Sequence, residues 1–557
     1  MRTTDSLLTA LRVAVPGLDV SATTSDRREY SRTTLTTATI PRLIAAPTTA
    51  DQLRRLVIAA GRERVHLYPI SRGRNWGYGD ACAPTDGQVI VDLGRMNRIH
   101  EVHPELGYAV IEPGVTFGQL AAHLEAAGLP FWVDVTGAGP DTSVLGNTLE
   151  RGYGHTPHAD HYHNSAGYEV VLADGRVLTT GFGHYAGSKV TYAYKPGVGP
   201  SLDGLFTQSN LGIVTRMGVW LQPKPKYLLG FVLFARDRSA IGELIDRLRP
   251  LRQLGILPST VHIANDLRVA SAAGRFPWDR ADGTSGLPDP LRAEYASKFE
   301  HSAWVGLGGL YGTRETAWAA ATELKRAVRG IARVQFVDQR KLNLFRRLVR
   351  VANRFGLGRE AAEKVANVGR AFGLLSGQTT PDFLLGAGWR SRKPALPGNA
   401  DPLDNGWGMV CVAPIAPQTG RDVTAALAAA DRVYAEYGFE PMVTVNLLTG
   451  RAACLVMSVA FDKSNPAETT RAGRCAAALT DAAVADGYHP YRCGTWAMDR
   501  LATGSETFWD VVATIKRALD PHGILAPGRY APSQLPATGG TNLSVRTPVP
   551  DAVASSI

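Results

Sequence analysis

YPISRGRNWGYGD, residues Tyr68–Asp80, carries an apolar strand directly into a loop with three glycines in seven residues. Glycine accepts positive φ and has no Cβ, so the backbone N–H groups of such a loop can approach an anion closely. The loop lacks the GxGxxG and GxxxxGKS/T spacings of the familiar nucleotide-binding loops. Taken alone, it predicts either a pyrophosphate cradle or a structural turn.

Two further glycine-rich stretches favour the cradle. TGAGPDTSVLGNTLERGYGHTPHADH (Thr136–His161) packs glycines and small residues between apolar runs and ends in a cluster of His, Tyr and Asp. DGLFTQSNLGIVTRMGVWLQP (Asp203–Pro223) places small residues before a β-like run. Because small side chains leave backbone amides exposed, such loops can bracket one extended dinucleotide.

The bulk composition is that of a large globular enzyme. The chain has 557 residues, of which 45% are hydrophobic and 20% charged, so two domains are expected. Its five cysteines are an odd number without a close pair, which argues against a disulfide framework and suits a reducing compartment. No run of eighteen apolar residues occurs, and Arg12 interrupts the apolar N-terminal stretch, so we expect a cytoplasmic protein without signal peptide or membrane span.

The chain is basic, with a net charge of +10 and a pI near 9.4. The basic residues are scattered through periodic segments and no RNA- or DNA-binding module is present, so we expect no nucleic-acid partner. The excess charge suits an anionic small ligand equally well.

Hydrophobic periodicity predicts an α+β chain. Short strands and helices alternate at first, and longer helices separated by strands follow from about residue 226. We expect one domain over residues 1–225, a second over 226–488, a segment over 489–530 that returns to the first domain, and a flexible tail over 531–557. The predicted helices are 49–62, 117–127, 241–251, 316–329, 423–437 and 507–519, and the predicted strands are 65–70, 88–93, 108–111, 304–310 and 408–412.

The three glycine-rich stretches, with EPGVTFGQL (Glu112–Leu120) between the first two and DPHGILAPGRY (Asp520–Tyr530) near the end, resemble the vanillyl-alcohol oxidase and p-cresol methylhydroxylase family of FAD-linked oxidases. The resemblance spans nearly the whole chain. It implies a PCMH-type FAD-binding domain and an inserted cap (substrate) domain with an antiparallel sheet flanked by helices. The residues that it implies for FAD are Ser71, Arg72, Gly73, Arg74, Asn75, Trp76, Gly77, Thr142, Ser143, Gly146, Asn147, Gly152, Gly154, His155, Asn210, Gly212, Ile213, Val214 and Arg529.

The family binds substrate phenolate with two tyrosines and an arginine, and the matching positions are Tyr78, Tyr491 and Arg492. Two phenolic O–H donors and a fixed cation favour ionisation of a phenol. The resemblance implies oxidation of a 4-alkylphenol or 4-hydroxybenzylic alcohol by hydride transfer to flavin N5 through a quinone methide. A second hypothesis is oxidation of another alcohol, a hydroxy acid or a biosynthetic intermediate. Oxygen or an electron-acceptor protein would reoxidise the flavin, and a homodimer is possible.

The sequence departs from the family at the catalytic base. Relatives carry an aspartate in a DVPD-like sequence, whereas this chain reads DVTGAGPD, so Asp134 matches the first acid and Gly137 the second. Asp141 is either a substitute base or the cap of the following turn. His155 replaces an active-site tyrosine and offers either a titratable acid or base or a hydrogen-bond donor to the substrate.

The positions of covalent flavin attachment also differ. Where relatives have a His or Tyr before an apolar strand, this chain has Gly408 and Met409, and where the berberine-bridge-enzyme branch has a His, it has Asn75. We therefore expect noncovalent FAD. Cys411 is the only nucleophile close by, and its apolar strand favours a packed thiol.

Two features permit other interpretations. His155, His158, His161 and His163 are spaced as metal ligands can be, but the family uses this stretch for flavin and substrate, so we expect no metal. Segment 340–370 has an apolar helical face opposite arginines, which fits a membrane surface or, as we favour, a cap helix with a solvated basic face.

Overall fold

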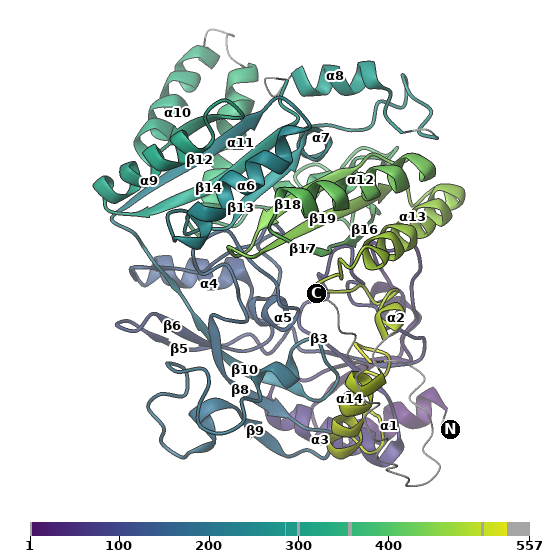
Figure 1. Cartoon of the computed structure of the whole chain (residues 1–557). Helices are drawn as coiled ribbons and strands as arrows, with labels where there is room; N and C mark the ends of the chain where they lie inside the picture. The colour runs from purple at the N-terminus through teal and green to yellow at the C-terminus, as the bar shows by residue number, and fades with distance from the viewer. Residues whose placement is uncertain (1–2, 285, 298–300, 355–358, 503–505, 532–557) are drawn as a thin grey trace, which may run out of the picture.

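The structure is a computed structural model, and it describes residues 3–284, 286–297, 301–354, 359–502 and 506–531. Strands and helices of the first part of the chain form one body, and the strands and helices between Tyr227 and Ala485 form a second body above it (Figure 1). The prediction of an α+β fold with two domains is confirmed. The proposed domain boundaries stay a prediction.

The first sheet of the N-terminal domain is built on parallel pairing. Strands β2 and β3 both pair parallel with β4, and the sheet order is β1-β2-β4-β3. Helices α1 and α3 cover this sheet with an apolar face that includes Leu7, Leu11 and Leu53. The elements are α1 (Thr4–Ala14), β1 (Asp19–Ser21), α2 (Thr24–Glu29), β2 (Leu43–Ala46), α3 (Ala50–Glu63), β3 (Leu67–Ile70) and β4 (Val89–Asp92).

A second, antiparallel sheet follows, in the order β5-β6-β10-β8-β9. Its core packs against helix α4 and the short helix α5, whose N-cap is Ser143. The elements are β5 (Ile99–His103), β6 (Tyr108–Ile111), α4 (Phe117–Ala126), α5 (Val144–Leu149), β8 (Ser165–Val171), β9 (Val177–Thr179), η1 (Gly181–His184), η2 (Asp203–Phe206) and β10 (Ile213–Trp220), with β7 (Phe131–Trp132) and β11 (Gln222–Pro223) as a small separate pair.

The cap domain contains an eight-stranded sheet in which every pair is antiparallel. Seven strands follow the order β15-β12-β14-β13-β18-β19-β16, and β17 also pairs with β19. The strands are β12 (Tyr227–Ala235), β13 (Val261–Asn265), β14 (Trp304–Gly312), β15 (Arg333–Val337), β16 (Gly408–Val412), β17 (Ile415–Pro417), β18 (Met442–Leu447) and β19 (Ala452–Phe461).

Four cap helices, α6, α9, α12 and α13, cover one face of this sheet and form the largest apolar core (Figure 1). The cap helices are α6 (Ala240–Gln253), α7 (Asp266–Ala273), α8 (Asp289–Ser297), α9 (Arg314–Ala327), α10 (Gln339–Arg354), α11 (Arg359–Leu375), η3 (Asp382–Gly388), α12 (Gly420–Tyr437) and α13 (Pro466–Ala485).

The opposite face of the cap sheet faces the N-terminal domain. Because side chains alternate between the two faces along a strand, every second residue of each strand lies on this face. In β16, Val410 and Val412 belong to the helix-covered core, whereas Met409 and Cys411 join a cluster with Trp76 of the glycine-rich loop. The same alternation in the neighbouring strands leaves His262, Asn446 and Cys454 outside the helix-covered core.

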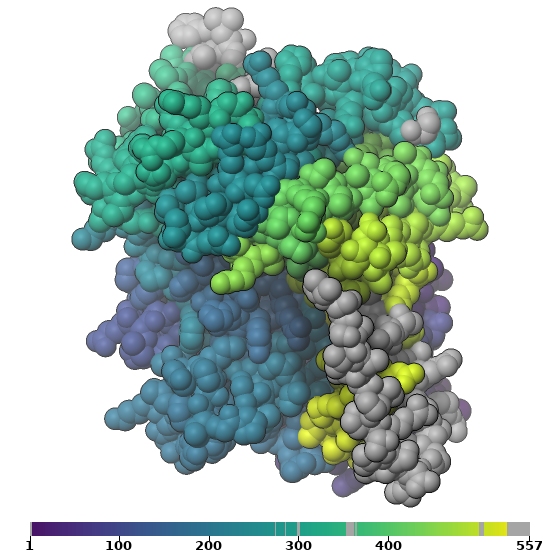
Figure 2. All heavy atoms as spheres, viewed as in Figure 1, coloured from purple at the N-terminus to yellow at the C-terminus, as the bar shows by residue number. Residues whose placement is uncertain are grey.

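The end of the chain returns to the N-terminal domain. Leu67 of β3 donates its N–H to the carbonyl of Ile524 and accepts from the N–H of Ala526, at 2.7 Å in both cases. Helix α14 (Glu506–Leu519) follows η4 (Asp499–Ala502) and supplies Lys516, whose ammonium bonds Asp520 and the carbonyl of Asn210. In the space-filling view, yellow atoms of this segment lie against the lower, blue body (Figure 2).

Most predicted elements have the expected type. Strands β6 and β16 have the predicted bounds, and the other predicted ends shift by a few residues. Segment 340–370 forms α10 and α11, with Leu344 and Leu348 exposed. None of the helices within the described ranges has the length and hydropathy to span a bilayer. The predicted tail beyond residue 531 lies outside the described residues.

Candidate functional site

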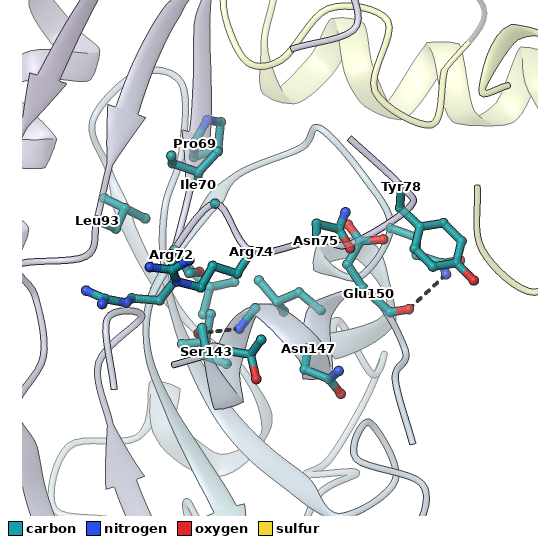
Figure 3. A pocket seen from close by; sticks show the side chains of 18 of the residues that line it. Pro69, Ile70, Arg72, Arg74, Asn75, Tyr78, Leu93, Ser143, Asn147 and Glu150 are labelled. Carbon is teal, nitrogen blue, oxygen red and sulfur yellow. Dashed lines mark hydrogen bonds between the residues drawn. The ribbon is translucent and has the colours of Figure 1, made fainter. Parts of the chain in front are cut away.

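An elongated pocket opens along the glycine-rich loop that follows β3, between β3, α5 and the start of β10. Figure 3 shows Arg72 and Leu93 at one end of it and Tyr78 and Glu150 at the other. Fourteen of the residues predicted to bind FAD line this pocket, namely Ser71, Arg72, Gly73, Arg74, Asn75, Trp76, Thr142, Ser143, Gly146, Asn147, Gly212, Ile213, Val214 and Arg529.

The loop is held by one buried carboxylate. Oδ2 of Asp80 accepts hydrogen bonds from the backbone and hydroxyl of Thr34 at 2.6 and 2.8 Å and from the hydroxyl of Thr33 at 2.9 Å. The hydroxyl of Thr34 in turn accepts from the N–H of Gly77, at 2.9 Å. Burial raises the pKa of Asp80 to about 6 despite these donors. The loop therefore has a preset shape that depends on Asp80.

Five predicted cofactor residues lie behind the pocket wall and not on it: Gly77, Gly152, Gly154, His155 and Asn210. A Cβ on Gly77 would lie 2.6 Å from Sγ of Cys411, and a Cβ on Gly152 or Gly154 would collide with the side chains of Asn147 and Asp134. Asn210 joins the C-terminal segment through the carbonyl of Ala526, at 3.3 Å. These five positions do not line the pocket in this structure, and their contact with FAD stays a prediction.

The residues present fit an extended anionic cofactor. Gly73 and Gly77 have φ of +62° and +76°, which opens the loop backbone toward the pocket. Two arginine nitrogens in the wall, Nε of Arg74 and Nε of Arg492, are buried and have no hydrogen-bond partner among the described residues. A diphosphate and an aromatic ring system would meet donors and small side chains along this wall.

One buried ion pair closes the pocket beside the C-terminal segment. The guanidinium of Arg529 bonds Glu150 and also donates to the hydroxyl of Tyr68 at 3.1 Å, and Tyr530 donates to Oε2 of Glu150 at 2.7 Å. Burial alone would raise the pKa of Glu150, but Arg529 and Arg492 hold it below its usual range. This pair ties the chain end to α5.

Tyr78 and Arg492, two of the three predicted phenolate-binding residues, line one end of the pocket, and Tyr491 lies close to both. The guanidinium carbon of Arg492 lies 4.0 Å from the ring centroid of Tyr78, and Arg492 donates to Asn75. Burial raises the pKa of Tyr78, and it raises the pKa of Tyr491 to about 12 although Arg492 opposes the shift. Both tyrosines therefore keep their protons near neutral pH and can donate to an oxyanion.

A histidine pair joins the two domains near this end. The ring of His155 stacks on the ring of His262 with centroids 4.1 Å apart, and Nδ1 of His155 donates to the carbonyl of Val135 at 3.0 Å. Nδ1 of His262 bonds Oδ1 of Asn446 at 2.6 Å, and Asn446 donates to the hydroxyl of Tyr153 at 2.9 Å. Burial lowers the pKa of both imidazoles, so both are neutral near pH 7.

Sequence reasoning missed His262 and Asn446, which are polar residues in two mainly apolar strands. Their register decides their position, because His262 pairs directly with Asn446 between β13 and β18. A polar residue at the same phase of two apolar strands was the available signal.

The two acidic candidates have different surroundings. Asp134 is buried and accepts the N–H groups of His155 and Thr156 at 3.0 and 2.8 Å and the ring of His161 at 3.2 Å. Burial favours its neutral form, but His161 holds the pKa of Asp134 below its usual value. Asp141 is exposed and does not line the pocket, and its role as a substitute base or as the cap of the following turn stays a prediction.

The histidine-rich stretch is spread over different contacts. His155 stacks on His262, His161 bonds Asp134 and Asn147, and His163 is exposed. Within the ranges that the structure describes, no group of three or more His, Cys, Asp or Glu side chains is arranged to hold a metal ion.

Cys411 is a packed thiol, as expected from its strand. Its N–H donates to the carbonyl of Gly77 at 3.1 Å, and Sγ lies 3.8 Å from the hydroxyl of Ser458. Burial raises the pKa of Cys411, which disfavours the nucleophilic thiolate. Met409 lies in the same cluster, and noncovalent attachment of FAD stays a prediction.

Comparisons with known proteins agree with this geometry. Residues 41–181 match the model of an FAD binding domain, and residues 498–530 match the C-terminal domain of FAD linked oxidases. The chain is 36% identical over 526 residues to 1'-carboxy-chondrochloren decarboxylase of Chondromyces crocatus, covering 94% of this chain and 96% of the relative. It is 33% identical over 497 residues to the flavoprotein subunit of 4-cresol dehydrogenase [hydroxylating] of Pseudomonas putida, covering 88% of this chain and 87% of that one.

Solved structures are similar over nearly the whole chain. The structure of p-cresol methylhydroxylase with substrate bound superposes with a TM-score of 0.84 at 31% identity and covers 95% of this chain and 96% of that one. The 4-ethylphenol oxidase from Gulosibacter chungangensis, in its isoeugenol complex, also has a TM-score of 0.84, at 26% identity, covering 95% and 97%.

Proposed function

Because this chain belongs to the p-cresol methylhydroxylase-type family of FAD-linked oxidases, we propose that it oxidises a para-substituted phenol, namely a 4-alkylphenol or 4-hydroxybenzylic alcohol. It is an FAD-dependent oxidoreductase. The observation that carries the phenol proposal is the cluster of Tyr78, Tyr491 and Arg492, in which a guanidinium lies over one phenol ring and beside another protonated phenol.

The protein's part in the reaction is to ionise and orient the phenol. The hydroxyls of Tyr78 and Tyr491 remain protonated, so both can donate to the substrate oxygen while Arg492 supplies positive charge. Stabilising the phenolate raises electron density at the para carbon and weakens the benzylic C–H bond. The neutral His155 and His262 pair is a candidate acceptor for a proton released nearby.

The loop residues Ser71–Trp76 and the first turn of α5 would hold FAD. When bound, FAD supplies a two-electron acceptor for the hydride that leaves the benzylic carbon. Trp76 and the cap residues Met409 and Leu384 form an apolar cluster beside Tyr78, and this cluster excludes water from the end where the phenol would bind.

The test is anaerobic reduction of the purified flavoprotein by 4-ethylphenol, followed by absorbance in a stopped-flow instrument. We expect Tyr78→Phe and Arg492→Lys each to slow reduction about 100-fold or more, because one preorganised donor or cation to an oxyanion is worth that much. FAD content should stay equal to that of the parent. The exposed Tyr185→Phe and Arg326→Lys serve as matched controls and should reduce at the parental rate. A parent protein that no 4-substituted phenol reduces would overturn the phenol proposal.

Oxidative decarboxylation is a second candidate, favoured by one observation in the cap. Arg268 offers a guanidinium without an acidic partner among the described residues, and a relative is named as a decarboxylase. After hydride loss, a carboxylate attached to the carbon next to the benzylic carbon can leave as CO₂. The electrons of the broken C–C bond form a double bond to the benzylic carbon, and the electrons of the quinone methide move through the ring to the phenolate oxygen. Release of one CO₂ per flavin reduced would support this reaction over simple dehydrogenation.

The remaining proposals concern location and partners. All five cysteines are free and buried, which supports a reducing, cytoplasmic location. Oxygen or an electron-acceptor protein completes the cycle, and admitting air after anaerobic reduction separates the two. A homodimer stays a prediction that mass measurement in solution would test.

A further inference from the structure

Arg268 lies in the first turn of α7, directly after β13. The side chain of Asn265 caps this helix by accepting the N–H of Arg268 at 2.9 Å. The guanidinium of Arg268 rests against η3, where a Cβ on Gly386 would lie 3.0 Å from Nη1. A glycine at this point leaves room for the guanidinium between α7 and η3.

The charge of Arg268 is not compensated within the protein. Among the described residues, its side chain donates no hydrogen bond and forms no ion pair, and burial lowers the pKa of its guanidinium. Two other arginines of the cap have several partners. Arg390 bonds Glu440 and two backbone carbonyls, and Arg252 donates to three backbone carbonyls through Nη1 and Nη2, although its Nε has no partner among the described residues. Arg268 is half-buried and keeps accessible surface, and without an acidic partner among the described residues its guanidinium is open to an external anion.

Arg268 lies on the same side of the cap sheet as the phenol end of the pocket. Burial raises the pKa of Cys411, while the charges of Arg268 and Arg492 both act to lower it. Cys411 is therefore within electrostatic reach of both arginines, and it contacts Gly77 in the loop that carries Tyr78. The cluster that contains Cys411 is otherwise apolar and includes Leu384 and Trp407. Apolar side chains thus lie between the guanidinium of Arg492 at the phenol end and the guanidinium of Arg268 in the cap.

We propose that Arg268 binds a carboxylate on the para substituent of the substrate, so that the substrate class is a phenolic acid with its phenol toward Arg492 and its carboxylate toward Arg268. This inference rests on the proposed oxidation of a phenol. The planar guanidinium suits a carboxylate because two parallel N–H···O bonds can form. The apolar cluster would contact the ring and the chain between the two charged ends.

The experiment compares two ligands that differ in the carboxylate, 3-(4-hydroxyphenyl)propanoate and 4-propylphenol, by calorimetric titration of the oxidised holoenzyme. We expect the parent to bind the acid at least 10-fold more tightly than the neutral phenol. Arg268→Met should lower this affinity ratio about 10- to 100-fold, because a hydrogen-bonded charge pair contributes about 1.5–3 kcal/mol. Arg268→Lys should retain part of the preference for the acid over the neutral phenol. Lysine keeps the positive charge but cannot form the two parallel N–H···O bonds of a guanidinium.

The exposed Arg280→Met in the same region serves as the control and should leave the ratio unchanged. An equal ratio in the parent and in Arg268→Met would overturn the assignment of Arg268. Binding of the acid through Arg268 without reduction of the flavin by either ligand would instead overturn phenol oxidation and support the carboxylate site. Reduction by 4-propylphenol without any preference for the acid would overturn the carboxylate site alone.

Discussion

In the N-terminal domain, Arg529 is half-buried beside Glu150, with Tyr68 and Tyr530 completing the hydrogen bonds of the pair. In the cap, Arg268 is half-buried and has no acidic neighbour among the described residues. The first arginine has its pKa raised and the second has its pKa lowered, because only the first has an anion to offset burial.

This difference separates charges that hold the fold from charges that are available to a ligand. Removal of Arg529 would leave the buried Glu150 without its ion-pair partner and with Tyr530 as its remaining hydrogen-bond donor, whereas removal of Arg268 would break no ion pair among the described residues. The stability effects of the two substitutions should therefore differ even though both residues are half-buried arginines.

The largest expected effect is that of Arg529→Met. It should destabilise the protein by about 3–5 kcal/mol, the usual cost of removing one partner of a buried ion pair, and it should lower FAD content. Thermal unfolding followed by circular dichroism measures the first and absorbance at the flavin band the second. The double variant Glu150→Gln/Arg529→Met should recover part of the loss, and failure to recover any would mean that the pair itself is not the cause.

A pH-dependent effect of similar size is expected from Asp80. Its folded-state pKa of about 6 lies above the ordinary value of 3.8 for an aspartate, so the protein gains stability from protonation that is fully present below about pH 4 and is lost as the pH rises through 6. The span is on the order of 3 kcal/mol. Unfolding midpoints of the parent and Asp80→Asn between pH 4 and 7 should diverge, with the variant changing less. Parallel curves would contradict the raised pKa.

A smaller effect should follow from Gly77→Ala, which combines positive φ with contact to Cys411. A Cβ there would lie 2.6 Å from Sγ, so we expect a loss of about 1–3 kcal/mol and weaker FAD binding. Gly187 is the matched control, because its φ is +73° and a Cβ on it would meet nothing within 4 Å. Equal losses in both variants would show that contact with the cap does not matter.

The smallest stability effect is expected for Arg268→Met. Its free energy of unfolding should stay within about 0.5 kcal/mol of that of the parent, since the substitution of this half-buried residue breaks no ion pair among the described residues. The comparison with Arg529 fails if Arg268→Met lowers stability as much as Arg529→Met does.

Much of the fold could be predicted because local patterns suffice for it. Strands β6 and β16 are apolar runs bounded by turn residues, and α3 begins after the N-cap Thr49, so their positions depend on neighbouring residues in the chain. The glycines at 152 and 154 look like cradle residues for the same local reason. A Cβ on them would collide with Asn147 and Asp134, and the second of these contacts, across twenty residues of the chain, could not be read from the local pattern.

The candidate site could be predicted only in part. Tyr78, Tyr491 and Arg492 came from motif resemblance, and they lie together as that resemblance implies. His262 and Arg268 could not be found in this way, because each is one polar residue near an apolar strand. Their importance depends on the register of β13 and on the packing of α7 against η3.

By itself, the sequence determined the α+β class, the order of the main elements and the glycine-rich loop of Tyr68–Asp80, since periodicity, capping and glycine conformation act over a few residues. Only the tertiary structure decided which residues line the pocket, which buried charges are paired, and that Asp141 is exposed. Burial and charge pairing are relations between distant segments, and no local pattern encodes the distance between Arg529 and Glu150 or the absence of an acid beside Arg268 among the described residues.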